Sequence, residues 1–270
     1  MAAMQPTELR SLALALLRQN DARAKADAVR ALPPLPAAPT RAELDADAVL
    51  DEPPGLPGRP QRPLLVDHLA LPRRGVGSRE GRAALLHAVA HIEFNAINLA
   101  LDACWRFAGM PRNYYADWLQ VAREEALHFS LLAEHLATLG HAYGDFDAHD
   151  GLWTMAQRTR HDIVARMALV PRTLEARGLD ATPPLQAKFA KAGDARAVQI
   201  LDIILRDEIG HVAIGNRWYR WLCERDGLDA LAHYPLLCTR HDAPRPRPPF
   251  NWEARSAAGF SADELARLGH

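Results

Sequence analysis

The chain has little cysteine, no excess charge of either sign and no long uninterrupted apolar run. Its three cysteines, Cys104, Cys223 and Cys238, lie far apart and form no C-x-x-C pair. This pattern is typical of reduced thiols and argues against a disulfide framework. The 32 basic and 33 acidic residues give a net charge of −1, so total charge provides no general attraction for nucleic acid or for an anionic membrane.

The missing apolar run bears on localisation. No stretch approaches the roughly 18 uninterrupted apolar residues that a membrane span requires. The apolar segment near the N-terminus is short and is flanked by Glu8, Arg10 and Arg18, unlike a secretory signal. We therefore expect a soluble, cytoplasmic protein. Its 270 residues are enough to bury a sizeable core without covalent staples.

Apolar periodicity and Pro/Gly signals predict an all-α chain with three parts. Residues 1–63 form an N-terminal arm, with an amphipathic helix from Thr7 to about Leu32 and then a proline-rich segment. We expect this segment to lie on the main domain, with a flexible linker as the alternative. Residues 64–230 form the main helical domain. Residues 231–270 form an extended tail that wraps its own domain, with a basic proline-rich recognition peptide as the alternative.

The main domain is predicted to contain four long helical segments bounded by Gly and Pro. They cover residues 78–107, 112–139, 150–178 with a shorter helix at 182–192, and 194–225. Pro171 should kink or break the third segment, and Asp194 is a plausible N-cap of the fourth. The tail ends in a short helix, because Ser261 and Glu264 have the spacing of a capping box.

Two Glu-x-x-His pairs are the most informative motifs, and each has a further glutamate upstream, by 32 residues in the first case and 33 in the second. On a helix, a Glu and a His three residues apart project from one face. Apolar neighbours argue against the alternative of two solvated surface pairs. The six side chains are Glu93, Glu125 and His128 in the first copy and Glu175, Glu208 and His211 in the second.

The predicted turns bring these side chains to matching heights. In two antiparallel helices, residues equidistant from the turn lie side by side. Glu93 and His128 are equidistant from the turn at 109–111, and the two glutamates of the second copy are centred next to Gly193. The interruption after residue 178 weakens the second case.

Four carboxylates and two imidazoles are the ligand set with which four-helix bundles hold two iron or manganese ions. We expect Glu125 and Glu208 to bridge two divalent ions and the histidines to bind one ion each. The other two glutamates would cap the ends. Mixed oxygen and nitrogen ligation without cysteine favours iron or manganese, as a di-iron or a mixed Mn/Fe centre, over structural zinc. No catalytic residue is predicted beyond the ligands.

Other acids and histidines near the motifs are assigned lesser roles. His87 and His91 are interpreted as structural histidines. His161 and Asp162 are reserve ligands should Glu175 not reach the site. Asp202 is a candidate for a hydrogen bond to a ligating histidine. Glu124 and Asp207, which precede the predicted bridging glutamates, are expected at the surface.

With these residues identified, the chain resembles the ferritin-like superfamily of four-helix di-metal carboxylate proteins. More closely, it resembles a bacterial family of ferritin-like proteins known as domain of unknown function 455. The runs that carry this resemblance are His91–Asn95, Arg123–His128, Leu169–Arg177, Asp207–Val212 and Asp242–Asn251. The run around Glu175 is also similar to one in the tRNA-modifying hydroxylase that acts on isopentenylated adenosine. The resemblance implies a ferritin-like four-helix bundle with all six ligand positions filled, and it implies no substrate.

The leading functional hypothesis is an O2-dependent oxidase or hydroxylase, in which two metal ions activate O2 against a small organic substrate. The arm and the tail would shape a pocket over the site. One alternative is a non-catalytic ferritin-like protein that binds or handles metal. Another is a tRNA-modifying hydroxylase, although the near-neutral charge gives no support to nucleic acid as a partner. No membrane partner is expected.

Overall fold

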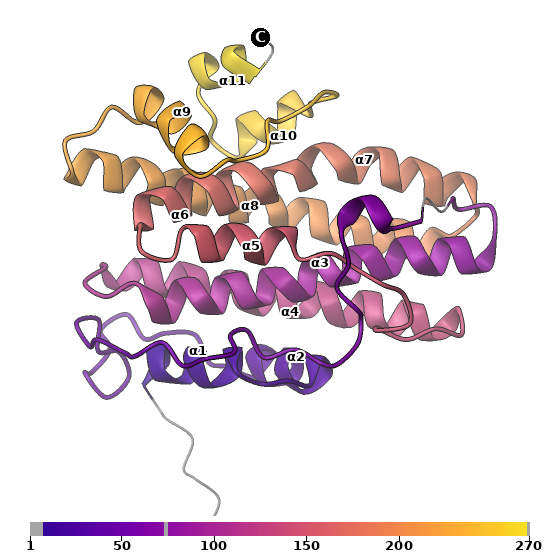
Figure 1. Ribbon diagram of the computed structural model, residues 1–270, viewed down its shortest axis with the longest axis horizontal. Helices are drawn as coiled ribbons and strands as arrows, with labels where there is room; N and C mark the ends of the chain where they lie inside the picture. Colours follow the sequence, from indigo (N-terminus) through magenta and orange to yellow (C-terminus); the bar gives the residue numbers. More distant parts are fainter. Residues whose placement is uncertain (1–7, 73–74, 269–270) are drawn as a thin grey trace, which may run out of the picture. The chain divides into compact units, whose positions relative to one another are not determined.

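The computed structural model describes residues 8–72 and 75–268 (Figure 1). Regular structure in these residues is helical, with no β-strand beyond an isolated bridge between Leu65 and Ala148. The all-α prediction is therefore confirmed for the described part of the chain. The chain divides into two compact units, one ending at Asp150 and the other starting at Gly151. Each is described by itself.

The first unit is built around a long antiparallel helix pair. Its elements are α1 (Leu9–Leu17), α2 (Ala22–Arg30), the 3-10 turn η1 (His68–Ala70), α3 (Arg79–Arg106) and α4 (Arg112–Thr138). The chain reverses between α3 and α4 at Gly109, which has a φ of +73° that disfavours other residues. Both predicted segments, 78–107 and 112–139, are confirmed. In Figure 1, α1 and α2 (indigo) lie alongside α3 and α4 (purple to pink).

The prediction of a single N-terminal helix reaching Leu32 was wrong, because α1 and α2 are separate helices. Asp21 caps α2 by accepting the N–H of Ala24 at 2.7 Å. The proline-rich segment crosses the gap between them, where Gly58 donates its N–H to the carbonyl of Leu17 at 2.8 Å. A Cβ atom on Gly58 would lie 2.2 Å from the carbonyl oxygen of Arg18. The predicted start at Thr7 falls outside the described residues.

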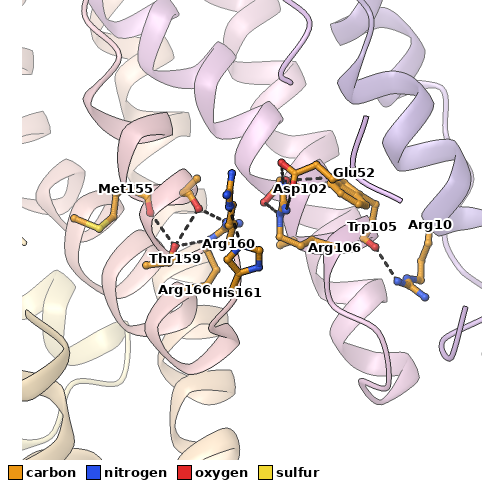
Figure 2. Close-up of polar contacts among 12 residues, drawn as sticks. Arg10, Glu52, Asp102, Trp105, Arg106, Met155, Thr159, Arg160, His161 and Arg166 are labelled. Carbon is orange, nitrogen blue, oxygen red and sulfur yellow. Dashed lines mark hydrogen bonds and ion pairs between the residues drawn. The ribbon is translucent and has the colours of Figure 1, made fainter. Parts of the chain in front are cut away.

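The proline-rich segment lies on its own unit, as predicted, and is not a free linker. Arg10 is buried and donates hydrogen bonds to the carbonyls of Asp45, Ala46 and Ala48. It also donates to the carbonyl of Trp105 in α3, a contact shown in Figure 2. Nη1 of Arg10 serves three of these carbonyls and Nη2 serves the fourth. Arg10 therefore fastens the segment to the end of α3.

A buried lysine makes a second fastening point. Lys25 of α2 donates from Nζ to the carbonyls of Leu17 and Gly58 and to Oδ1 of Asn98 in α3. Burial, and then the charge of Arg59, lower the pKa of Lys25 to about 7. The Nζ group thus joins both N-terminal helices, the proline-rich segment and α3.

α3 is the described helix that is long and apolar enough to cross a membrane, and 72% of its most apolar window is buried inside the structure. Such burial is typical of the core helix of a soluble protein. The finding is consistent with the predicted solubility and provides no positive indication of a compartment.

The second unit contains a second long helix pair and a wrapped tail. Its elements are α5 (Gly151–Arg158), α6 (Ile163–Leu169), the π-helix η2 (Val170–Glu175), α7 (Ala176–Lys191), α8 (Ala195–Arg225), α9 (Ala230–Arg240), α10 (Trp252–Ala257) and α11 (Ala262–Leu268). α7 and α8 reverse at Gly193, with a φ of +72°, and Asp194 caps α8 by accepting the N–H of Ala197. The predicted fourth segment is confirmed.

The third predicted segment was wrong in two places. Its break lies before α6, where Arg166 donates to the hydroxyl of Thr159 at 2.9 Å and that hydroxyl donates to the carbonyl of Met155 (Figure 2). Pro171 does not end the helix, because the wider π-helical turn accommodates it without the usual i to i−4 bond.

α7 then continues through Gly178 and across the two prolines at 183 and 184, so the separate helix predicted at 182–192 does not exist. A proline at 183 has no N–H for the carbonyl of Leu179, the residue four positions earlier. The side-chain amide of Asn251, in the tail, donates to that carbonyl at 3.2 Å. A residue distant in sequence therefore compensates for the proline.

The tail is extended over 243–250, as predicted, but α9 and α10 were not predicted. The capping box is confirmed, since the N–H of Ser261 donates to Glu264 and the N–H of Glu264 donates to the hydroxyl of Ser261. The division at residues 63 and 230 and the ferritin-like arrangement of the long helices stay predictions.

Candidate metal centre

The first unit brings together Glu93 of α3 with Glu125 and His128 of α4, as the turn at 109–111 predicts. Nδ1 of His128 lies 3.2 Å from a carboxylate oxygen of Glu93 and 3.3 Å from one of Glu125. One nitrogen or oxygen atom from each side chain lies within 4.8 Å of the other two, and all three residues are buried. This group has the ligand types and the spacing to hold a metal ion.

The two carboxylates of this group lie close together in a buried place, and this affects the pKa of Glu93. Burial raises the pKa of Glu93 well above its ordinary value, and the neighbouring carboxylate of Glu125 raises it further. His128 opposes the increase only in part. Two carboxylates in a buried site repel each other unless a proton or a cation lies between them. A divalent cation fits this donor set.

Aromatic packing holds the helix pair together beside the group. Phe94 follows Glu93 in sequence and Phe129 follows His128, and their ring centroids are 5.6 Å apart. Tyr143 packs on both rings, at 5.5 and 5.0 Å. These contacts rigidify the part of α3 and α4 that presents the ligands.

His87 and His91 are structural, as the sequence indicates. His91 hydrogen-bonds Tyr143 and the amide of Asn95, and His87 accepts the N–H of Gly144 at 2.9 Å. Burial lowers the pKa of His87 to about 4 and that of His91 to about 3, so both are neutral at physiological pH. They belong to the core and not to the ligand group.

The second unit holds the other Glu-x-x-His pair on α8 and Glu175 at the end of η2. All three residues are buried, and Nδ1 of His211 lies 3.9 Å from a carboxylate oxygen of Glu208. A Cβ atom at Gly178, one turn after Glu175, would lie 4.0 Å from the carboxyl carbon of Glu208. Glu175 therefore lies on the face of its helix that meets Glu208.

The reserve ligands are directed elsewhere. His161 is exposed and accepts a hydrogen bond from Arg160 (Figure 2), while Asp162 caps α6. Asp202 is exposed and binds Gln186, so its candidacy for a hydrogen bond to a ligating histidine has no support.

The two acids predicted at the surface are only partly exposed, and each contacts a neighbour. Glu124 accepts a hydrogen bond from Gln120, and Asp207 accepts one from Arg206. Neither is part of the group made by Glu93, Glu125 and His128.

The close approach of η2 to α8 is a feature that the sequence did not reveal. Gly215 lies one turn after His211, and a Cβ atom there would lie 2.5 Å from Cβ of Pro171. Pro171 in turn lies one turn before Glu175. Because Gly215 has no side chain, η2 can pack closely against α8 at this point. This packing fixes the position of Glu175 along the helix that carries Glu208 and His211.

The sequence of residues 18–266 matches the model of a family described as Protein of unknown function (DUF455). The chain belongs to this family. It is also similar to an uncharacterized protein of Haemophilus influenzae, with 57% identity over 213 residues that cover 76% of this chain and 74% of the relative. No solved structure matches the chain. The predicted resemblance to this family is confirmed, whereas the links to the ferritin-like superfamily and to the tRNA hydroxylase stay predictions.

Proposed function

We propose that the protein binds two divalent metal ions, iron or manganese, and uses them as an O2-dependent oxidase or hydroxylase of a small organic substrate. The observation that supports the proposal most strongly is the buried group of two carboxylates and an imidazole on α3 and α4. The proposed ligands are Glu93, Glu125, His128, Glu175, Glu208 and His211.

The second unit contains three further side chains of the ligand types found in the first. Glu93, Glu125 and His128 provide enough ligands for one ion but not for two with open positions for water and substrate. Glu175, Glu208 and His211 offer the same chemistry in the same order along the chain, also buried. Taken together they match the ligand count of di-metal carboxylate proteins.

The burial of the carboxylates supports a metal site over a purely structural cluster. Carboxylates removed from water cost several kcal/mol each unless a charge partner compensates. The pKa of Glu93 is raised by its burial and by the adjacent carboxylate of Glu125, as expected of acids that a cation would stabilise. A bound cation would supply this charge, and it would bring Lewis acidity and access to O2 chemistry. The protein's part is to hold the ligands and exclude bulk water.

Metal stoichiometry tests the proposal. Metal-free full-length protein is dialysed against Mn²⁺, and bound ions per chain are counted. We expect two ions for the parent protein and fewer for Glu125→Gln and Glu208→Gln, because each change removes a negative ligand. The matched controls are Glu124→Gln and Asp207→Asn, each one position earlier on the same helix. Equal binding by the ligand variants and their controls would overturn the metal site.

Oxygen consumption tests the enzymatic part. We expect the protein loaded with Fe²⁺ under anaerobic conditions to consume O2 when air is admitted, and Glu125→Gln to lose this activity. Uptake of many iron ions per chain, with continued O2 consumption, would support metal handling instead. A metal-loaded protein that is inert to O2 would contradict the oxidase assignment.

A further inference from the structure

We propose that the C-terminal tail is a clamp that positions Glu175, and this inference rests on the proposed function of Glu175 as a metal ligand. Three tail residues, Asn251, Arg255 and Glu264, contact η2 and α7 directly before and after Glu175. We call these residues the C-terminal clamp. Each of its contacts lies within the second unit.

On the N-terminal side of Glu175, the clamp holds Arg172. The guanidinium of Arg172 is buried and donates to a carboxylate oxygen of Glu264 at 2.8 Å and to Oδ1 of Asn216 on α8 at 2.6 Å. Its charged carbon also lies 4.9 to 5.1 Å from the ring centres of three aromatic residues, Tyr219, Tyr234 and Phe260. These hydrogen bonds and ring contacts together restrict the orientation of the guanidinium.

The surroundings of Glu264 favour its ionised form, which accepts the hydrogen bond from Arg172. Burial alone would raise the pKa of Glu264, but Arg172, the N–H of Ser261 and Arg220 together hold it below its ordinary value. Arg220 of α8 donates to the second carboxylate oxygen at 2.8 Å. Glu264 therefore links α11 to both η2 and α8 by charge-assisted hydrogen bonds.

On the C-terminal side of Glu175, the clamp holds the first turns of α7. Arg255 donates to both carboxylate oxygens of Asp180, at 3.0 and 2.6 Å, and to the carbonyl of Ala176. Asn251 donates its N–H to Asp180 and its amide to the carbonyl of Leu179. Ala176, Leu179 and Val212 share an apolar cluster with Ala254, Ala258 and Phe260 of the tail.

The reason that Glu175 needs external support lies in its own helix. Glu175 is the last residue of a π-helical stretch, which is a local departure from the regular α-helix, and Pro171 in this stretch has no backbone N–H to donate. The carboxylate position is thus less determined by its helix than those of Glu125 and Glu208, which lie inside long α-helices. Contacts on both sides remove this freedom.

Residues that orient metal ligands without touching the metal change metal affinity by about 10 to 100-fold when substituted. Glu264→Gln keeps the size of the side chain and removes its charge. We therefore expect this variant to bind one of the two ions with an affinity about ten-fold or more below that of the parent. The other ion should be bound as in the parent, because Glu175 is proposed to cap only one end of the di-metal centre.

The test is a titration of metal-free full-length protein with Co²⁺, followed by the visible absorption of the bound ion. Glu264→Gln is compared with Glu253→Gln, an identical change on the same tail at an exposed position. We expect two equivalents with parent-like affinity and spectrum for Glu253→Gln. For Glu264→Gln we expect a weakened second equivalent with an altered spectrum.

Circular dichroism and urea unfolding separate positioning from folding. Should Glu264→Gln lose helix content, Asp180→Asn tests the same idea from the other side of Glu175 with the same expected result. Two folded variants that bind both Co²⁺ equivalents like the parent overturn the clamp and leave the proposed function standing. Loss of folding in both variants overturns the clamp in favour of a structural role. A parent that binds no Co²⁺ overturns both proposals.

Discussion

Two glycines of α8 provide a matched pair that tests how η2 is placed. A Cβ atom at Gly210 would meet nothing within 4 Å, whereas one at Gly215 would lie 2.5 and 2.7 Å from Cβ and Cγ of Pro171. Both glycines lie inside the same α-helix. The change from Gly to Ala therefore has the same effect on helix propensity at both positions and a different effect on packing.

The magnitudes follow from these contacts. Replacing Gly by Ala in a helix interior contributes roughly 0.5–1 kcal/mol of stability, so Gly210→Ala should stabilise the protein by about this amount. At Gly215 the added methyl group meets a proline ring that cannot rotate away. Overpacking of this kind costs about 1–3 kcal/mol. Since the gain in propensity is the same at both positions, Gly215→Ala should be less stable than Gly210→Ala by about 1–3 kcal/mol.

Urea unfolding of the two full-length variants, compared with the parent under identical conditions, measures the difference. We also expect Gly215→Ala to weaken the binding of the ion that Glu175 is proposed to cap, because movement of Pro171 moves Glu175. Gly210→Ala should bind metal like the parent. If Gly215→Ala proved as stable as Gly210→Ala, the close approach of η2 to α8 would be refuted.

Three further predictions concern other parts of the chain. Because the pKa of Lys25 is lowered to about 7 in the folded protein from an ordinary value of 10.5, the unfolded chain binds more protons between these values. The free energy of unfolding should therefore rise from pH 7.5 to 9.5 more steeply in the parent than in Lys25→Met, by about 1 kcal/mol per pH unit in urea titrations; equal slopes would contradict this. Arg10→Met removes the hydrogen-bond donor for four carbonyls, and each bond contributes about 1 kcal/mol. Thermolysin should therefore cleave residues 33–63 faster in this variant than in the parent. Unchanged cleavage would refute the role of Arg10 in fastening the segment. Removal of metal by a chelator should lower the melting temperature, and re-addition of Mn²⁺ should restore it; identical melting with and without metal would count against a folded-state site.

The parts of the fold that the sequence predicted are those set by local signals. The turns at Gly109 and Gly193 each need a positive φ, and Gly at a helix end is the signal for it. The long helices on either side follow from apolar periodicity. Once both helices of a hairpin are known, the pairing of Glu93 with His128 follows from equal distance to the turn.

The parts that the sequence did not predict depend on residues far away in the chain. The apolar stripe of the N-terminal helix continues past residue 18. Asp21 is a local signal for the start of α2, but the contact of Gly58 with the end of α1 involves a residue about 40 positions away. The prolines in α7 are ordinary stop signals, and Asn251 changes their effect by hydrogen-bonding the carbonyl of Leu179. No local pattern connects residues so far apart.

The same applies to the surroundings of Glu175. The capping box pointed to Glu264 as a helix cap, but its ion pair with Arg172 joins residues 92 positions apart. Arginine is usually found at the surface, yet Arg172 and Arg255 are buried. The sequence contained one signal for this partner. Arg172 lies in an apolar run three residues before Glu175, and a buried arginine requires a charge partner.

The most direct test of the central claim is anomalous diffraction at the manganese and iron edges, on crystals of the full-length protein loaded with Mn²⁺ or Fe²⁺. We predict two anomalous peaks, held between them by Glu93, Glu125, His128, Glu175, Glu208 and His211. A crystal without a peak at these residues, or with one ion held by Glu93, Glu125 and His128 alone, would contradict the di-metal centre.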